Sequence, residues 1–272
     1  MRWPEPPTDP SPSGRGVGVR VLRQILALTI AALSATATAN PPPPPLRLAV
    51  AANFSAPARE IAAAFESQGG GKVEIVTGAT GNLFVQIVEG APFDVFLAAD
   101  RRAPEALEAR GLALAGTRFT YAVGRLVLWS RDPDWVDAHG DVLRTGTFHH
   151  LAIANPIFAP YGRAALQVLD SKGVREKLEE RIVRGESIAQ AYEFVASGNA
   201  ELGFVALSQV WHDGHFDPGS AWLVPEHLHE PIEQDAVGVA ASKHPEAARA
   251  FLAFLHGEKA QAILAAHGYR AP

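Results

Sequence analysis

Short apolar runs alternate with segments of helical periodicity from residue 46 almost to the end of the sequence. Residues 46–51 (LRLAVA) have the pattern of a buried strand, and apolar residues recur at helical spacing after them, as far as Phe65. The same succession repeats, and the segments that we predict as strands are 46–51, 73–77, 95–98, 126–129, 151–154, 202–205 and 237–240. Strands that alternate with helices are typical of α/β proteins with mainly parallel sheets.

Two segments late in the chain carry a different pattern. Residues 245–266 have helical patterning, and residues 175–184 (REKLEERIVR) are dense in charge. We interpret 175–184 as a helix or loop on a solvated face, because interleaved charges of both signs are usually hydrated.

The N-terminal segment has the features of a secretory signal. Arg20 and Arg23 precede an apolar run at 25–33, and the small residues of 37–39 (ATA) follow it. The run is too short to span a bilayer as a stable helix, although an uncleaved anchoring segment is the alternative. We therefore predict a signal peptide over 1–39, a proline-rich spacer over 40–45 and a periplasmic product.

Composition excludes several classes of function. The chain has no cysteine, which excludes thiol catalysis, zinc ribbons and iron–sulfur ligation, so an exported product must rely on its core of apolar residues. The formal net charge is −5, and the predicted leader holds four arginines against Glu5 and Asp9, so the remaining chain is more acidic still. This balance argues against a nucleic-acid partner, which normally requires a basic face.

Four of the predicted strand-to-helix turns present small or polar residues where a helix begins. Asn53 and Thr80 follow the first two strands at N-cap positions, and Tyr161 and Ser187-Ile188 open two later helices. The first N–H groups of a helix lack internal partners and carry partial positive charge, so such ends bind anions without lysine or arginine. Each turn taken alone is equally consistent with ordinary helix capping.

Signs of catalysis are weaker. The ten histidines lack a matching set of carboxylates at ligand spacing, so we expect neither a metal site nor a cofactor. Asp94 and Asp100 flank the third predicted strand and could act as paired acids in a phosphate- or sulfate-ester hydrolase, or simply end a strand and cap a helix. The sequence has no phosphate loop, dinucleotide fingerprint or nucleophile elbow, and we predict no catalytic residues.

Four stretches of the sequence resemble the periplasmic molybdate-binding proteins of ATP-binding-cassette importers. They read AVAANFSAPAREIAAAF, TGATGNLFVQIVEGAPFDVFLAAD, ANPIFAPYGRAAL and AELGFVALS, and residues 90–100 are the most specific part. The resemblance implies a two-lobed binding-protein fold, with lobe I over 46–122 plus 230–272 and lobe II over 123–229. We expect hinge crossings near 121–125 and 225–234. The effector lobe of a transcription regulator shares this architecture, but it would need a DNA-binding segment in place of an export signal.

The resemblance also implies a site between the lobes, where neutral donors hold a tetrahedral oxyanion. Some relatives carry a ligand-binding tyrosine where this chain has Ala206, and Tyr161 could supply that phenol instead. Molybdate or tungstate is the expected ligand, with sulfate or phosphate as alternatives, a membrane permease as the partner and a monomer as the working form. The residues implied to bind the anion are Ala52, Asn53, Thr80, Tyr161 and Ile188.

Overall fold

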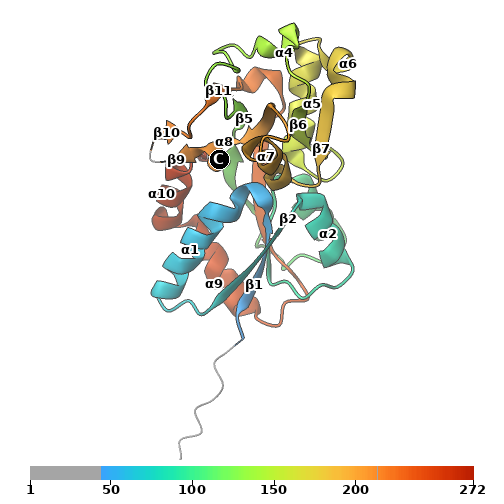
Figure 1. Ribbon diagram of the computed structural model, residues 1–272. Helices are drawn as coiled ribbons and strands as arrows, with labels where there is room; N and C mark the ends of the chain where they lie inside the picture. The colour runs from blue at the N-terminus through green and yellow to red at the C-terminus, as the bar shows by residue number, and fades with distance from the viewer. Residues whose placement is uncertain (1–43, 213) are drawn as a thin grey trace, which may run out of the picture. The chain divides into compact units, whose positions relative to one another are not determined.

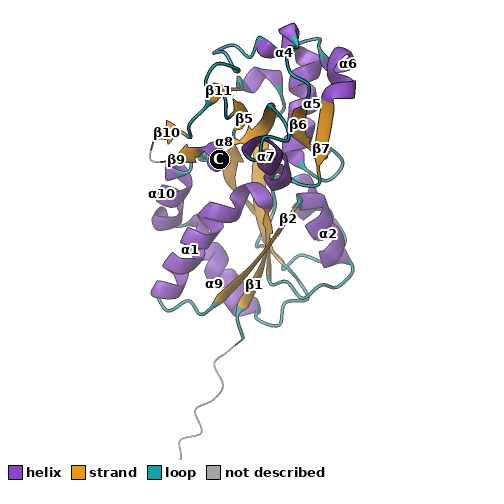
Figure 2. Cartoon of the chain, viewed as in Figure 1, coloured by secondary structure: helices purple, strands orange, loops and turns teal. Residues whose placement is uncertain are grey.

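Two five-stranded sheets organise the computed structural model, which describes residues 44–212 and 214–272 (Figure 1). The predicted signal peptide over 1–39 and most of the proline-rich spacer lie outside the described residues. We call each sheet with its flanking helices a lobe (Figure 2). None of the helices within 44–212 and 214–272 is long and apolar enough to cross a membrane.

The first lobe is built on a sheet with the strand order β2-β1-β3-β12-β4. Strand β1 pairs in parallel with β2 and β3, whereas β12 is antiparallel to both of its neighbours. The elements of this lobe are β1 (Leu46–Ala51), η1 (Ala52–Phe54), α1 (Ser55–Ser67), β2 (Val73–Gly78), α2 (Thr80–Val88), β3 (Val95–Leu97), α3 (Arg102–Ala109), β4 (Phe119–Gly124), β12 (Ile232–Gly238), α9 (Pro245–His256) and α10 (Glu258–Ala266).

Each face of the first sheet buries its own apolar cluster. Strand β1 illustrates the cause, since successive side chains of a strand point to opposite faces. Leu48 and Val50 pack in the cluster with Phe54 of η1, and Ala49 packs in the other cluster with Leu83 of α2. Helices therefore cover both faces of the sheet. The turns that join strands to helices lie at the ends of the strands.

The second lobe is built on a sheet with the order β11-β5-β8-β6-β7, in which β5 is the strand that runs against the others. One apolar cluster extends through this lobe. Its elements are β5 (Leu126–Ser130), α4 (Val142–Thr145), β6 (Leu151–Ala154), α5 (Pro160–Ser171), α6 (Arg175–Leu178), η2 (Glu179–Arg181), β7 (Ile182–Gly185), α7 (Ile188–Ala196), β8 (Leu202–Ala206), α8 (Leu207–Val210), β9 (Trp211–His212), β10 (His215–Phe216), β11 (Ser220–Leu223) and η3 (Glu226–Leu228).

The α/β class is confirmed, but the sheets are mixed, and several elements differ from the sequence prediction. Only residues 237 and 238 of the last predicted strand, 237–240, belong to a strand, the end of β12, which begins at Ile232. The charged segment 175–184 contains the start of β7, because Ile182 and Val183 pair with Leu151 and Ala152 of β6. Residues 245–266 form two helices, since Gly257 has an extended backbone between them.

The chain passes between the two sheets twice. It leaves the first sheet at the end of β4 and enters the second at β5, with Arg125 between the two strands. It returns over residues 224–231, between β11 and β12. Whether these two crossings act as hinges stays a prediction. In the described structure they bring β4 and β12 side by side as an antiparallel pair.

Candidate functional site

The positions that the sequence suggested lie at the carboxyl ends of two pairs of parallel strands. In the first lobe, Ala51 of β1 pairs with Gly78 of β2, and η1 and α2 begin immediately beyond them. In the second lobe, Ala154 of β6 pairs with Gly185 of β7, and α5 and α7 follow. Ligands of α/β proteins commonly bind outside the carboxyl ends of such strands.

The two sets of helix starts meet at the boundary between the lobes. Helix α7 packs on η1, and the N–H of Gly81 in α2 donates to the carbonyl of Phe158, just before α5, at 2.8 Å. The five predicted side chains are buried, with exposed fractions from 1% to 8%. They are Ala52, Asn53, Thr80, Tyr161 and Ile188.

The predicted capping roles of Asn53 and Thr80 are wrong. Asn53 lies inside η1, and Thr80 is the first residue of α2. The residues at the two N-cap positions are Ala51 and Ala79, which provide no side-chain cap. Of the four helix starts, α7 alone has such a cap, because the Ser187 hydroxyl accepts from the N–H of Gln190. First-turn N–H groups of η1, α2 and α5 are thus not taken up by capping side chains.

The side chain of Asn53 bonds within the protein. Its Nδ2 donates to Gln234 Oε1 and to Tyr269 Oη, both at 3.0 Å. Its backbone carbonyl accepts from Ser208 Oγ at 2.8 Å and from Tyr269 Oη at 2.9 Å. The amide that was expected to donate to an anion instead ties η1 to β12 and to the C-terminal segment, and the backbone carbonyl ties η1 to α8 of the other lobe.

Tyr161 contacts the other end of the Gln234 side-chain amide. Gln234 Nε2 donates to Tyr161 Oη at 3.2 Å, so the phenol oxygen is an acceptor in this bond. Tyr161 is 1% exposed, and burial raises the pKa of its phenol well above the ordinary value despite the hydrogen bond from Gln234, so the group keeps its proton. Within the described residues, that proton meets no acceptor.

The hydroxyl of Thr80 is in the same situation. Its Oγ1 accepts from the N–H of Ala99 at 3.0 Å, and its own proton has no acceptor in the described parts of the chain. Buried polar hydrogens normally find partners, so two of them without one, at neighbouring helix starts, indicate a place for an acceptor. No lysine or arginine bonds to any of the five positions in the part of the chain that the structure describes.

Three further contacts join the lobes around these helix starts. Besides the Gly81–Phe158 bond, Arg163 of α5 forms an ion pair of 2.5 Å with Asp100 of the first lobe. The Ser208 hydroxyl of the second lobe is bonded to Asn53 and lies 3.1 Å from Tyr269 Oη. These contacts enclose the site on several sides.

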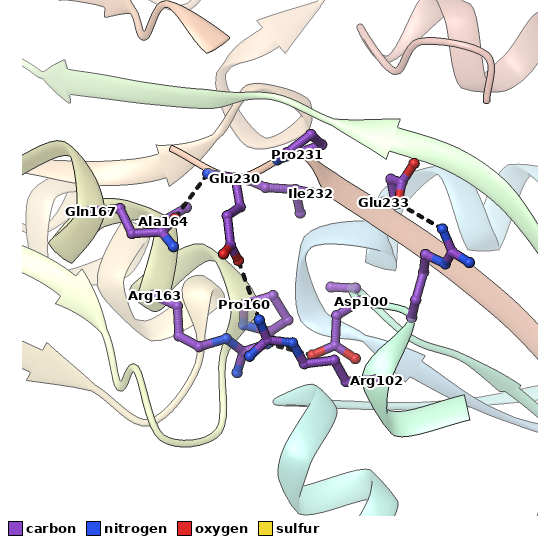
Figure 3. Close-up of a pocket in the computed structure, with 12 residues that line it drawn as sticks. Asp100, Arg102, Pro160, Arg163, Ala164, Gln167, Glu230, Pro231, Ile232 and Glu233 are labelled. Carbon is purple, nitrogen blue, oxygen red and sulfur yellow. Dashed lines mark hydrogen bonds and ion pairs between the residues drawn. The ribbon is translucent and has the colours of Figure 1, made fainter. Parts of the chain in front are cut away.

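A cavity of about 320 Å³ lies beside the five positions and does not include them (Figure 3). It is lined by residues 99–102, by part of α5 and by residues 230–233. Its arginines are already paired with carboxylates, as the contacts of Arg163, Arg102 and Arg101 with Asp100, Glu230 and Glu233 show. The charges that line this cavity are therefore neutralised by one another, whereas the buried hydroxyl protons of Thr80 and Tyr161 have no acceptor within the described residues.

The aspartates considered as acids have other roles. Asp94 accepts from the N–H of Arg47 at 2.7 Å and from Ser242 Oγ at 2.5 Å. Asp100 accepts from the N–H of Ala103 at the start of α3 and pairs with Arg163. Both carboxylates are engaged in holding strands and helices together.

Sequence reasoning missed the residues that support the site. Gln234, Tyr269, Ser208 and Tyr121 are all at most 6% exposed and belong to one hydrogen-bonded network with Asn53 and Tyr161. A signal for Gln234 exists in the polar run Glu233-Gln234-Asp235, which stands between the apolar residues of β12. Tyr269, close to the end of the chain, carries no comparable signal.

The fold agrees with the family to which the sequence is related. The model of the family described as bacterial extracellular solute-binding protein matches residues 46–270, and the chain belongs to this family. The molybdate-binding protein ModA of Azotobacter vinelandii is 54% identical over 224 residues, which are 82% of this chain and 89% of that protein. The ModA protein of Rhodobacter capsulatus is 49% identical over 221 residues, covering 81% and 86% of the two chains.

A solved structure has the same architecture. The Azotobacter vinelandii periplasmic molybdate-binding protein superposes with a TM-score of 0.82 and 44% identity. The superposition covers 84% of this chain and 99% of that chain, so it includes both lobes.

Proposed function

We propose that this protein captures molybdate between its two lobes and delivers it to an ATP-binding-cassette importer. The observation that carries the proposal is the pair of buried hydroxyl protons, on Thr80 and Tyr161, that have no acceptor within the described residues. Main-chain N–H groups at the starts of η1, α2 and α7 add further hydrogen-bond donors. They include the N–H groups of Ala52, Asn53 and Ile188. A fully deprotonated tetrahedral oxyanion offers acceptors alone and satisfies such a set.

The same donors supply selectivity. Hydrogen phosphate carries a proton of its own, which would face donors and remain unpaired at a cost of about 1–3 kcal/mol. Sulfate has no proton but is smaller than molybdate, so donors fixed by the protein would not all reach it, at a similar cost for each donor left unpaired. Tungstate is nearly the size of molybdate, and we expect it to bind comparably.

The same proposal includes where the protein acts and how its lobes move. Residues 1–39 are a cleaved signal peptide, and the protein acts in the periplasm as a monomer and not as an enzyme. The lobes proposed from the sequence are 46–122 plus 230–272 and 123–229, which assign Val123 and Gly124 to lobe II although both pair with β12 in the first sheet. The crossings near Arg125 and over 224–231 are the hinges. Closure around the anion would create the surface that the membrane permease recognises. The identities of ModA proteins with this chain support the ligand and the importer.

Thermal unfolding with added anions tests the proposal. A ligand present at about 100 times its Kd stabilises the native state by about 2.7 kcal/mol, which is a readily measured shift in Tm. We expect shifts with molybdate and tungstate and none with phosphate or sulfate at the same concentration. A shift with sulfate alone would assign the site to sulfate, and no shift with any of the four anions would refute oxyanion binding.

A further inference from the structure

We propose that Gln234 is a positioning residue that makes the Tyr161 phenol a hydrogen-bond donor to the anion. The inference rests on the proposed function and deepens it, because it names the residue that fixes the direction of one donor. Gln234 does not touch the anion in this proposal. It acts by occupying the acceptor side of the phenol oxygen, so that the phenol proton must point elsewhere.

The orientation of the Gln234 amide is set by its other neighbours. Its Oε1 accepts from Asn53 Nδ2 and from Tyr121 Oη, each at 3.0 Å. Asn53 Nδ2 is a donor only, so the oxygen end of the Gln234 amide faces it. The nitrogen end then faces Tyr161 Oη at 3.2 Å. A phenol that receives an N–H cannot give its proton back to the same group, which leaves that proton for a ligand.

A bulge in β4, where it pairs with β12, places Tyr121 against the Gln234 side chain. The register between β12 and β4 shifts between Gln234 and Asp235, where Gln234 pairs with Ala122 and Asp235 with Thr120. β12 advances by one residue there while β4 advances by two, so the extra residue of the bulge is Tyr121 of β4, whose Oη donates to Gln234 Oε1. Within β12, Gln234 and Asp235 point to opposite faces, as neighbouring residues of a strand do. Both side chains are 0% exposed, and Asp235 bonds to Thr120 and Arg118, which is a separate set of partners.

Gly124 makes the approach of the two side chains possible. A Cβ atom placed on Gly124 would clash with Tyr161 Oη and would lie 2.5 Å from Gln234 Nε2. Any larger residue at the end of β4 would separate the phenol from the amide. The glycine and the amide orientation both favour the bond between Gln234 and Tyr161, and the bulge in β4 places Tyr121 against the same amide.

The substitution Gln234→Glu tests the proposal, because the two side chains have the same shape and differ in what they offer to Tyr161. As a carboxylate, the new side chain accepts the phenol proton and withdraws it from the anion, and it also adds a negative charge. We expect affinity for sodium molybdate to fall at least about 100-fold at about pH 9. As a carboxylic acid, the side chain can again donate to Tyr161 and accept from Asn53.

The dependence of molybdate affinity on pH reports this change between the carboxylate and the carboxylic acid. Anion binding to the Gln234→Glu variant takes up one proton. The affinity for molybdate therefore rises as the pH falls through the interval between two pKa values, that of the new carboxyl in the anion-bound form and that of the same carboxyl in the free form. The slope approaches tenfold per pH unit. Titration calorimetry from about pH 9 to about pH 5 measures it. Wild-type affinity should be flat over this range, because glutamine does not titrate and the Tyr161 pKa lies well above it.

Two comparisons separate the action through Tyr161 from simple repulsion of the anion. Gln167→Glu adds the same charge on α5, where Gln167 Oε1 already acts as an acceptor for the N–H of Glu230, and it should weaken binding less than about 3-fold. In a Tyr161→Phe background, adding Gln234→Glu should cost at least about 10-fold less than it costs in the wild type. Equal losses in the two backgrounds would overturn the proposal.

A second route keeps the inference testable if Gln234→Glu does not fold. Gly124→Ala separates the phenol from the amide without adding charge, and we expect it to weaken molybdate binding about 10-fold in a protein with a wild-type circular dichroism spectrum. Unchanged affinity in Gly124→Ala, or a flat pH profile in Gln234→Glu, contradicts a positioning role. The wild-type titration with molybdate decides the proposed function separately.

Discussion

At Gly81, the addition of one methyl group should weaken anion binding without lowering the stability of the ligand-free protein. Gly81 is the second residue of α2, next to Thr80, and it faces Phe158 across the boundary between the lobes. A Cβ atom on Gly81 would lie 3.0 Å from Phe158 Cα, 3.1 Å from its Cδ1 and 3.2 Å from its carbonyl oxygen. Carbon atoms in good contact are about 3.5–4.0 Å apart, so all three contacts are too short.

The cost of Gly81→Ala falls on the closed form. Two of the three contacts are with backbone atoms, which cannot turn away as the end of a flexible side chain can. Overpacking of this kind costs about 1–3 kcal/mol, and it is relieved when the lobes move apart. On the proposed hinge motion the anion closes the lobes against this cost, so we expect its Kd to rise about 5- to 150-fold.

The ligand-free protein should respond in the opposite direction. Alanine is a better helix former than glycine by about 0.5–1 kcal/mol, and Gly81 has no positive φ that would strain an alanine. The Tm without anion should therefore stay the same or rise while calorimetry with molybdate reports weaker binding. Gly78→Ala is the matched control, because its Cβ would meet only the Leu83 side chain of the same lobe, at 3.4 Å. Unchanged affinity in Gly81→Ala, or a fall in both affinity and ligand-free Tm, would refute the reasoning.

Three other substitutions give separate tests. Tyr161→Phe removes a donor to a charged ligand, so molybdate affinity measured by calorimetry should fall about 10- to 100-fold, and an unchanged Kd would exclude the phenol from the site. Arg118→Ala leaves the fully buried Asp235 carboxylate without its 2.7 Å ion pair and should cost about 3 kcal/mol in urea unfolding. Burial alone would raise the pKa of Asp137, but three backbone N–H groups bound to its carboxylate lower the net pKa below the ordinary value. The stability from Asp137 is thus present above the unfolded-state pKa and is lost as the pH falls through the folded-state pKa, so Asp137→Asn should narrow the difference in unfolding free energy between about pH 7 and about pH 3.

The succession of strands and helices was predictable from local pattern because each element buries a face with its own period. The strands at 46–51 and 151–154 were predicted with the bounds that the structure has. β7 and β11 were missed because IVRG and SAWL are short and stand next to polar, charged or glycine-rich segments. β4 (FTYAVG) was missed because residues 121–125 were interpreted as a hinge crossing. Such segments become strands by pairing with distant neighbours, as β11 does with β5, and their own sequence carries little evidence of it.

The candidate site was also predictable from the sequence only in part. The sequence by itself determined which turns begin helices and which residues stand there, because strand endings and helix periodicity are local properties. It did not determine what those residues do. Asn53 was predicted to lie at an N-cap position and to bind the anion, yet its amide bonds to Gln234 and Tyr269, which are 181 and 216 residues away in the chain. Only the tertiary structure could decide this, because a buried amide or hydroxyl takes its role from the partners that the fold places within about 3 Å of it.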